Sequence, residues 1–123
     1  MNLMNLSNPS SNARRKGLIL VALLWSGAAH AVTGQCVLVV DGKTYLNGPC
    51  PMTLEKGGDF TIGSDGKTMS KHFAMVSIDK ASGTGDGWWN GPEGGGHAHD
   101  KLGLLTRKGA CWTNERAKVC ATK

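Results

Sequence analysis

The stretch "CVLVVDGKTYLNGPC", residues 36–50, predicts a β-hairpin that is closed by its own disulfide. Asp41-Gly42 is a type I′ turn dipeptide, and it lies between the expected strands 37–40 and 43–46. Continued from this turn, the register places Cys36 opposite Asn47. A bend at the Gly-Pro dipeptide that follows would then return Cys50 towards Cys36. We therefore expect a Cys36–Cys50 bridge.

A second hairpin is expected at "CWTNERAKVC", residues 111–120, with its turn at 114–117. This register sets Cys111 directly opposite Cys120, at the separation that a disulfide requires. The alternative pairing, 36–120 with 50–111, would tie the two ends of the domain together and remains open. The chain has no C-x-x-C motif, so neither a redox pair nor a zinc knuckle is indicated.

The rest of the chain also favours strands. Short apolar runs at 59–63 and 72–79 are separated by turn residues, and a glycine-rich break is expected at 83–87. A further hairpin is expected over 101–113, with its turn at 107–109. No stretch after the N-terminal segment has the apolar periodicity of a helix. These features predict an all-β domain of about eight short strands, arranged as a small antiparallel barrel or sandwich.

The N-terminal segment 1–31 has the layout of a signal peptide. The basic residues Arg14-Arg15-Lys16 precede the apolar run 18–25, and an Ala-x-Ala site ends at Ala31. That run is shorter than the roughly 20 residues that a membrane span needs. We expect cleavage after Ala31, which leaves a single periplasmic or secreted domain, 32–123, without a membrane span.

Removal of this segment changes the charge of the chain. The full sequence carries 14 Lys and Arg against 9 Asp and Glu. Loss of the three basic residues of the signal leaves 11 against 9, a net charge of about +2. The remaining basic residues are scattered along the chain, so the basic patch of a nucleic-acid-binding protein is missing and no nucleic-acid partner is expected.

No motif for catalysis stands out, and we expect the protein not to be an enzyme. Four paired cysteines leave no thiol nucleophile. A Ser-His-Asp triad could be drawn from Ser70, His72 and Asp79, but no nucleophile-elbow motif surrounds the serine. The three glycines 94–96 do not open a helix, so they do not form a nucleotide-binding loop.

Two histidines raise the alternative of a metal-binding module. In extended chain, His97 and His99 point to the same side, and Asp100 follows directly. Two imidazoles and a carboxylate suit Zn²⁺ or Cu²⁺, although a structural site would be one ligand short. A polar loop before the next strand explains the same residues, and no cofactor is expected.

Adjacent tryptophans make 86–100 the expected contact segment. Trp88 and Trp89 should point to opposite faces of a strand, one into the core and the other outward, unless the following loop covers both. The sequence does not show which is exposed, and a carbohydrate-binding module that stacks on Trp89 is an alternative. The candidate partner-binding residues of this segment are Trp88, Trp89, Asn90, Glu93, His97, His99 and Asp100.

The stretches "DGKTYLNGPC" and "AHDKLGLLTRKGACWTNERAKVCA" resemble a pattern found in an uncharacterised family of small exported proteins of Gram-negative bacteria. That resemblance implies a periplasmic or secreted product and no particular activity. In general build the chain also resembles the periplasmic inhibitors of c-type lysozyme, small disulfide-stapled β-barrels, but no residue of theirs is carried over. We therefore expect a non-enzymatic binding module for a protein or cell-envelope ligand, and inhibition of a hydrolase is one concrete form of it.

Overall fold

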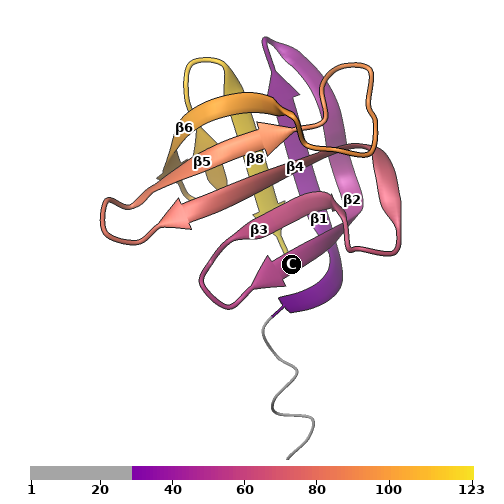
Figure 1. The fold of residues 1–123 in the computed structure, drawn as a ribbon, viewed down its shortest axis with the longest axis horizontal. Helices are drawn as coiled ribbons and strands as arrows, with labels where there is room; N and C mark the ends of the chain where they lie inside the picture. The colour runs from indigo at the N-terminus through magenta and orange to yellow at the C-terminus, as the bar shows by residue number, and fades with distance from the viewer. Residues whose placement is uncertain (1–28) are drawn as a thin grey trace, which may run out of the picture.

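The computed structural model describes residues 29–123, which form one closed antiparallel β-barrel (Figure 1). The all-β prediction is confirmed, and the barrel, not the sandwich, is the arrangement adopted. Residues 1–28 of the expected signal peptide lie outside the described residues, and its last three residues, 29–31, begin the first strand. Within the described range there is no helix long and apolar enough to cross a membrane.

Each strand pairs with the next along the chain, and the last pairs with the first. The strands are β1 (Ala29–Val40), β2 (Lys43–Glu55), β3 (Phe60–Ser64), β4 (Met69–Asp79), β5 (Thr84–Trp89), β6 (Asp100–Lys108), β7 (Cys111–Thr113) and β8 (Ala117–Thr122). Successive connections therefore alternate between two ends of the barrel. We call the end with the β2–β3, β4–β5 and β6–β7 turns the mouth end, and the other the loop end (Figure 1).

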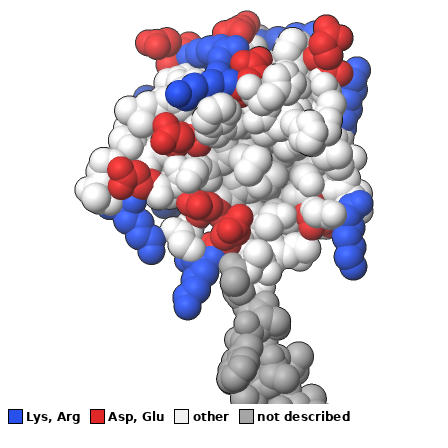
Figure 2. All heavy atoms as spheres, in the orientation of Figure 1, with Lys and Arg blue, Asp and Glu red and all other residues white. Residues whose placement is uncertain are grey.

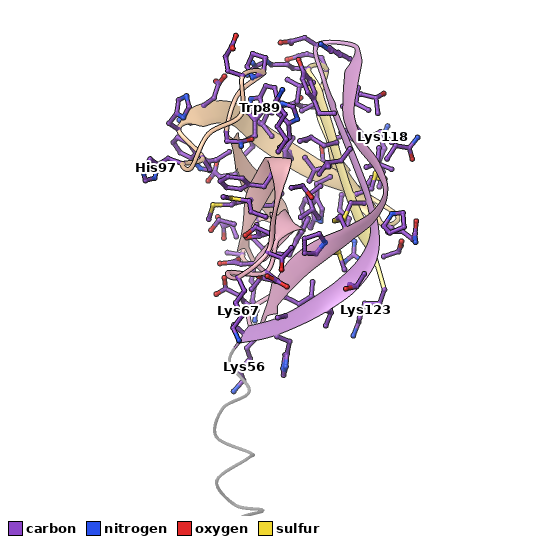
Figure 3. All side chains as sticks on the ribbon, turned by 90° about the vertical axis from the view of Figure 1, so that its right-hand side faces the viewer. Lys56, Lys67, Trp89, His97, Lys118 and Lys123 are labelled. Atoms are coloured by element: carbon purple, nitrogen blue, oxygen red, sulfur yellow. A yellow bond between two sulfur atoms is a disulfide. The ribbon has the colours of Figure 1, made fainter. Side chains whose placement is uncertain are left out.

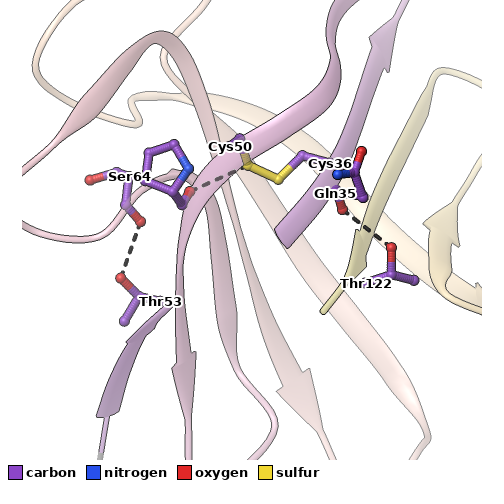
Figure 4. The surroundings of a disulfide bond; sticks show 7 residues. Gln35, Cys36, Cys50, Thr53, Ser64 and Thr122 are labelled. Atoms are coloured by element: carbon purple, nitrogen blue, oxygen red, sulfur yellow. Dashed lines mark hydrogen bonds between the residues drawn. A yellow bond between two sulfur atoms is a disulfide. The ribbon is translucent and has the colours of Figure 1, made fainter. Parts of the chain in front are cut away.

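The first hairpin forms as predicted at its turn. Asp41 and Gly42 both have positive φ, 52° and 81°, as a type I′ turn requires. Figure 4 shows the expected Cys36–Cys50 disulfide between β1 and β2. The turn residues thus fix the hairpin, and the disulfide fastens it.

The register of this hairpin differs from the prediction. A β-bulge at Tyr45 of β2, opposite Leu38 and Val39, shifts the pairing by one residue, so that Cys36 faces Gly48 and not Asn47. The expected return of the chain after residue 47 is wrong, because β2 stays paired with β1 through Gly48 and Pro49 and places Cys50 opposite Gly34. The bridge therefore joins diagonal neighbours, with 6.0 Å between their Cα atoms.

The second disulfide also forms as predicted. Cys111 of β7 pairs directly with Cys120 of β8, and their Cα atoms are 4.0 Å apart. The alternative pairing of the four cysteines is thereby excluded. Two structural disulfides are consistent with an oxidising extracellular or periplasmic location.

The barrel interior is filled by side chains from all around the wall. In β4, Ala74 and Val76 point inward while Met75 is exposed, which follows the expected alternation. Side chains that are at most 1% exposed fill the interior, and the larger ones are Leu38, Val40, Met52, Ile62, Val76, Trp89, Leu105 and Val119.

The glycine-rich break expected at 83–87 is wrong, because β5 runs through most of it. Gly85 and Gly87 are buried within that strand. A Cβ at Gly85 would lie 2.7 Å from Cγ1 of Val76, and one at Gly87 would lie 2.7 Å from Cδ1 of Leu105. These glycines are therefore inward positions left empty so that larger neighbours fit inside a narrow barrel.

Candidate functional site

The two adjacent tryptophans separate as predicted, with Trp88 outward and Trp89 inward. Trp88 is 37% exposed, whereas Trp89 is 1% exposed and lies in the core. The Trp89 ring packs edge-on against Tyr45, with 4.8 Å between centroids. The expectation that a sugar stacks on Trp89 is therefore wrong, because its ring faces are covered by protein.

Asn90 is buried as well, which corrects its expected role as a contact residue. It is 1% exposed, and its Oδ1 accepts a hydrogen bond from the Phe73 backbone N–H at 3.0 Å. Its Nδ2 donates to the carbonyl oxygens of Lys71 and Gly95, each at 3.0 Å. Asn90 thus fastens the loop 90–99 to the start of β4.

The remaining predicted residues of that loop are at the surface. Glu93, His97 and His99 are exposed and Asp100 is half-buried, and Figure 3 shows His97 at the outer edge of the loop. Nδ1 of His99 lies 3.0 Å from the His97 carbonyl oxygen. Residues 29–123 contain no group of three or more His, Cys, Asp or Glu that could hold a metal ion, so the metal alternative has no formed site.

The structure does not bring together the triad that the sequence could offer, Ser70, His72 and Asp79. His72 lies at the loop end, where its Nε2 is 2.9 Å from the carbonyl oxygen of Pro92. Asp79 is seven residues further along β4, where it accepts a hydrogen bond from the Ala81 N–H in the turn at the mouth end. At about 3.3 Å per strand residue, the two side chains are far apart.

The outer faces of β4, β5 and β6 carry three exposed apolar side chains, and we call this surface the Trp88 face. Met75 is 43%, Trp88 37% and Leu104 62% exposed. Met75 and Trp88 are direct cross-strand partners, and Lys101 of β6 is the next partner of Trp88 in the same row. Exposed apolar side chains therefore lie on three neighbouring strands of one sheet face.

Charged groups surround this apolar centre. Nζ of Lys101 lies 5.4 Å from the centroid of the Trp88 ring, and Asp86 is the cross-strand partner of Leu104. Figure 2 shows uncharged side chains over much of the middle of the molecule in this view, with charged ones mostly towards its outline. The Trp88 face therefore combines an aromatic centre with charges of both signs at its edge.

A second site, which the sequence did not reveal, opens at the mouth end. It is a cavity of about 750 Å³ whose apolar wall includes Leu54, Phe60, Ile78 and Trp112. These residues come from four strands and are far apart in sequence, so only closure of the barrel brings them together. The one signal in the sequence is apolar residues at strand ends, beside glycine-containing turns.

Charged side chains stand around this cavity. Glu55 and Asp59 lie on the side of the β2–β3 turn, while Lys80 begins the β4–β5 turn and Arg107 lies near the end of β6. Among residues 29–123 the one ion pair within 4.0 Å is elsewhere, between Arg116 and Asp41 at the loop end. The rim charges are therefore not neutralised by one another in close contact.

Comparison with protein-family models, with curated proteins and with solved structures gave no match to this chain. The geometry itself defines a small disulfide-bonded β-barrel with two distinct surfaces. One is the Trp88 face on the outer wall, and the other is the apolar cavity at the mouth end.

Proposed function

We propose that this protein is an exported, non-enzymatic binding module of the periplasm or the extracellular medium, and that it docks a protein partner on the Trp88 face. The observation that carries the proposal is Trp88, exposed between Met75 and Lys101 on a continuous sheet face. Protein interfaces are typically organised in this way, with aromatic anchors at the centre and a polar rim.

The rigidity of this surface supports the proposal. Trp88 lies within β5, which pairs with β4 on one side and with β6 on the other. A side chain held in the middle of a sheet loses little further freedom when a partner binds, so more of the contact energy remains as affinity. The two disulfides stabilise such a surface outside the cytoplasm.

A protein partner fits the Trp88 face better than a sugar does. Sugar stacking needs a free ring face, but the ammonium of Lys101 lies over the Trp88 ring and Met75 lies beside it. Lys101 and Asp86 offer charges of both signs, which suit the mixed charges of a protein surface and fix the orientation of the partner. Inhibition of a hydrolase by such docking is one concrete form of this function.

The test begins with affinity capture from periplasmic extract and from host secretions, followed by purification of the captured protein. Its dissociation constant is then measured with the wild type, with Trp88→Ala and with Met69→Ala. Met69 is 51% exposed at the start of β4, outside the Trp88 row, and is the matched control. Lysozyme inhibition is assayed on the same samples.

We expect Trp88→Ala to weaken binding at least tenfold, as loss of a central anchor does, and Met69→Ala to leave it unchanged. Unchanged thermal midpoints show that both variants remain folded. Equal affinity of Trp88→Ala and the wild type, or capture of a glycan in place of a protein, would overturn the proposal.

A further inference from the structure

The cavity at the mouth end is a blind apolar pocket. Its inner wall includes Phe60 and Trp112, each 8% exposed, and the barrel beyond is filled by side chains such as Val76 and Leu105 that are 1% exposed. No chain can thread through a barrel that is packed in this way. The apolar part of any ligand must therefore be compact, and it must remain at the mouth.

The basic groups of the rim are free to meet a ligand. Nε of Arg107 donates to the carbonyl oxygen of Gly109 at 2.9 Å, which holds the guanidinium at the rim by its inner nitrogen. Lys80 is exposed in the β4–β5 turn, and the pairing of Thr84 with Thr106 places that turn beside the end of β6. Lys80 and Arg107 thus stand on neighbouring parts of the rim.

The acidic groups are less available. Oδ1 of Asp59 accepts a hydrogen bond from the Ile78 backbone N–H at 2.7 Å, so this carboxylate already serves the β3–β4 pairing. Glu55 is exposed on the same side, at the end of β2. Of the four charged groups of the rim, the two basic ones and Glu55 are therefore exposed, whereas the carboxylate of Asp59 is already engaged.

From this arrangement we infer that the mouth binds a small amphiphilic organic anion, with its compact apolar body against Leu54, Ile78 and Trp112 and its anionic group against Lys80 and Arg107. The planar guanidinium can pair with a carboxylate through two hydrogen bonds, while lysine adds a point charge. The volume lies within the range of small-molecule sites in proteins, and the mouth of a β-barrel is a common place for one. This site is independent of docking on the Trp88 face.

Three naphthalene probes test the inference because they share one apolar body and differ in head group: 2-naphthylacetate, 2-(2-naphthyl)ethanol and 2-(2-naphthyl)ethylamine. Their affinities are measured by titration calorimetry at low salt with the full mature protein. We expect the carboxylate to bind about tenfold tighter than the alcohol, and the amine to bind more weakly than the alcohol. The difference in affinity between the carboxylate and the alcohol should become smaller as salt is added.

Variants identify the groups responsible. The double variant Lys80→Gln with Arg107→Gln should bind the carboxylate only as tightly as the alcohol, and its affinity for the alcohol should equal that of the wild type. The control Lys67→Gln, at the loop end, should change neither affinity. Ala110→Trp, at an exposed lining residue, should abolish binding of all three probes, while Ala81→Trp in the neighbouring turn, outside the lining, should not.

Equal affinity for carboxylate and alcohol, tightest binding of the amine, or no binding of any probe at millimolar concentration would overturn the inference. None of these outcomes bears on partner capture through Trp88.

Discussion

The side chain of Asn90 binds the backbone of Phe73, with 3.0 Å between Oδ1 and the amide nitrogen, at a position where Asn90 is 1% exposed. The same side chain donates to Lys71 and Gly95, so a single amide fixes the loop 90–99 on β4. Asn90→Ala leaves these backbone groups without partners. We expect a loss of about 2–4 kcal/mol in the free energy of unfolding, measured by urea denaturation.

The matched control for this prediction is Asn47→Ala, because Asn47 is exposed on β2. Its free energy of unfolding should stay within about 0.5 kcal/mol of the wild type. If both variants unfold at the same urea concentration, the buried side chain of Asn90 does not hold the loop.

Replacing either inward glycine of β5 by alanine is expected to destabilise the fold, because there is no room for the added methyl group. Gly85→Ala and Gly87→Ala each set a Cβ 2.7 Å from a core side chain, and we expect each to cost about 1–3 kcal/mol. Gly96→Ala has no neighbour within 4 Å of the added atom and should leave stability nearly unchanged. Thermal and urea unfolding of the three variants compare them directly, and a stable Gly85→Ala protein would mean that the interior has spare room.

The two disulfides should differ in their rate of reduction. Cys36 and Cys50 are 0% and 3% exposed, whereas Cys111 is half-buried at the edge of the last hairpin. Thiolate attack requires access to sulfur, so dithiothreitol should open Cys111–Cys120 first. Alkylation followed by mass spectrometry gives the order, and faster loss of Cys36–Cys50 would contradict it. Loss of either bridge should cost roughly 2–4 kcal/mol.

Asp65 in the β3–β4 turn should give an acid-sensitive contribution to stability. Hydrogen bonds from the backbone N–H groups of Thr68, at 2.6 Å, and Lys67, at 2.9 Å, hold the pKa of its carboxyl below the ordinary value. A folded-state pKa below the unfolded value of about 3.9 stabilises the fold above that pH, and this contribution disappears as the pH falls through the folded-state pKa.

The comparison that tests this is urea unfolding of the wild type and Asp65→Ala at pH 7 and below pH 3. The wild type should be the more stable at pH 7, and the difference should shrink in acid. A constant difference at both pH values would mean that the ionised carboxylate is not what stabilises the turn.

Local sequence was sufficient for the parts of the fold that depend on neighbouring residues. The turn at Asp41-Gly42 and the facing pair Cys111 and Cys120 follow from turn chemistry and strand alternation alone. The register at Cys36 did not, because a β-bulge has no reliable sequence signal. The glycines of β5 were misread as a break because only the closed barrel shows that inward positions must be small there.

The candidate sites could likewise be predicted only where they depend on neighbouring residues in the sequence. Strand alternation predicted that Trp88 and Trp89 face opposite sides of the sheet. Which of the two is exposed could be decided only from the pairing of β5 with β4. The sequence indicates a polar loop residue at Asn90, and only the folded structure shows that its side chain is buried. The mouth cavity could not be predicted, because its wall joins residues from Leu54 to Trp112 that meet only when the barrel closes.

The most direct test of docking on the Trp88 face is photo-crosslinking in the native compartment. Leu104, the most exposed large apolar residue of that face at 62%, is replaced by p-benzoylphenylalanine, and Thr33 on β1, across the barrel from β5, serves as the control position. We predict a light-dependent adduct with one partner protein from position 104 that disappears when Trp88→Ala is added, and no such adduct from position 33. The same adduct from both positions, or an adduct that survives Trp88→Ala, would contradict docking on this face.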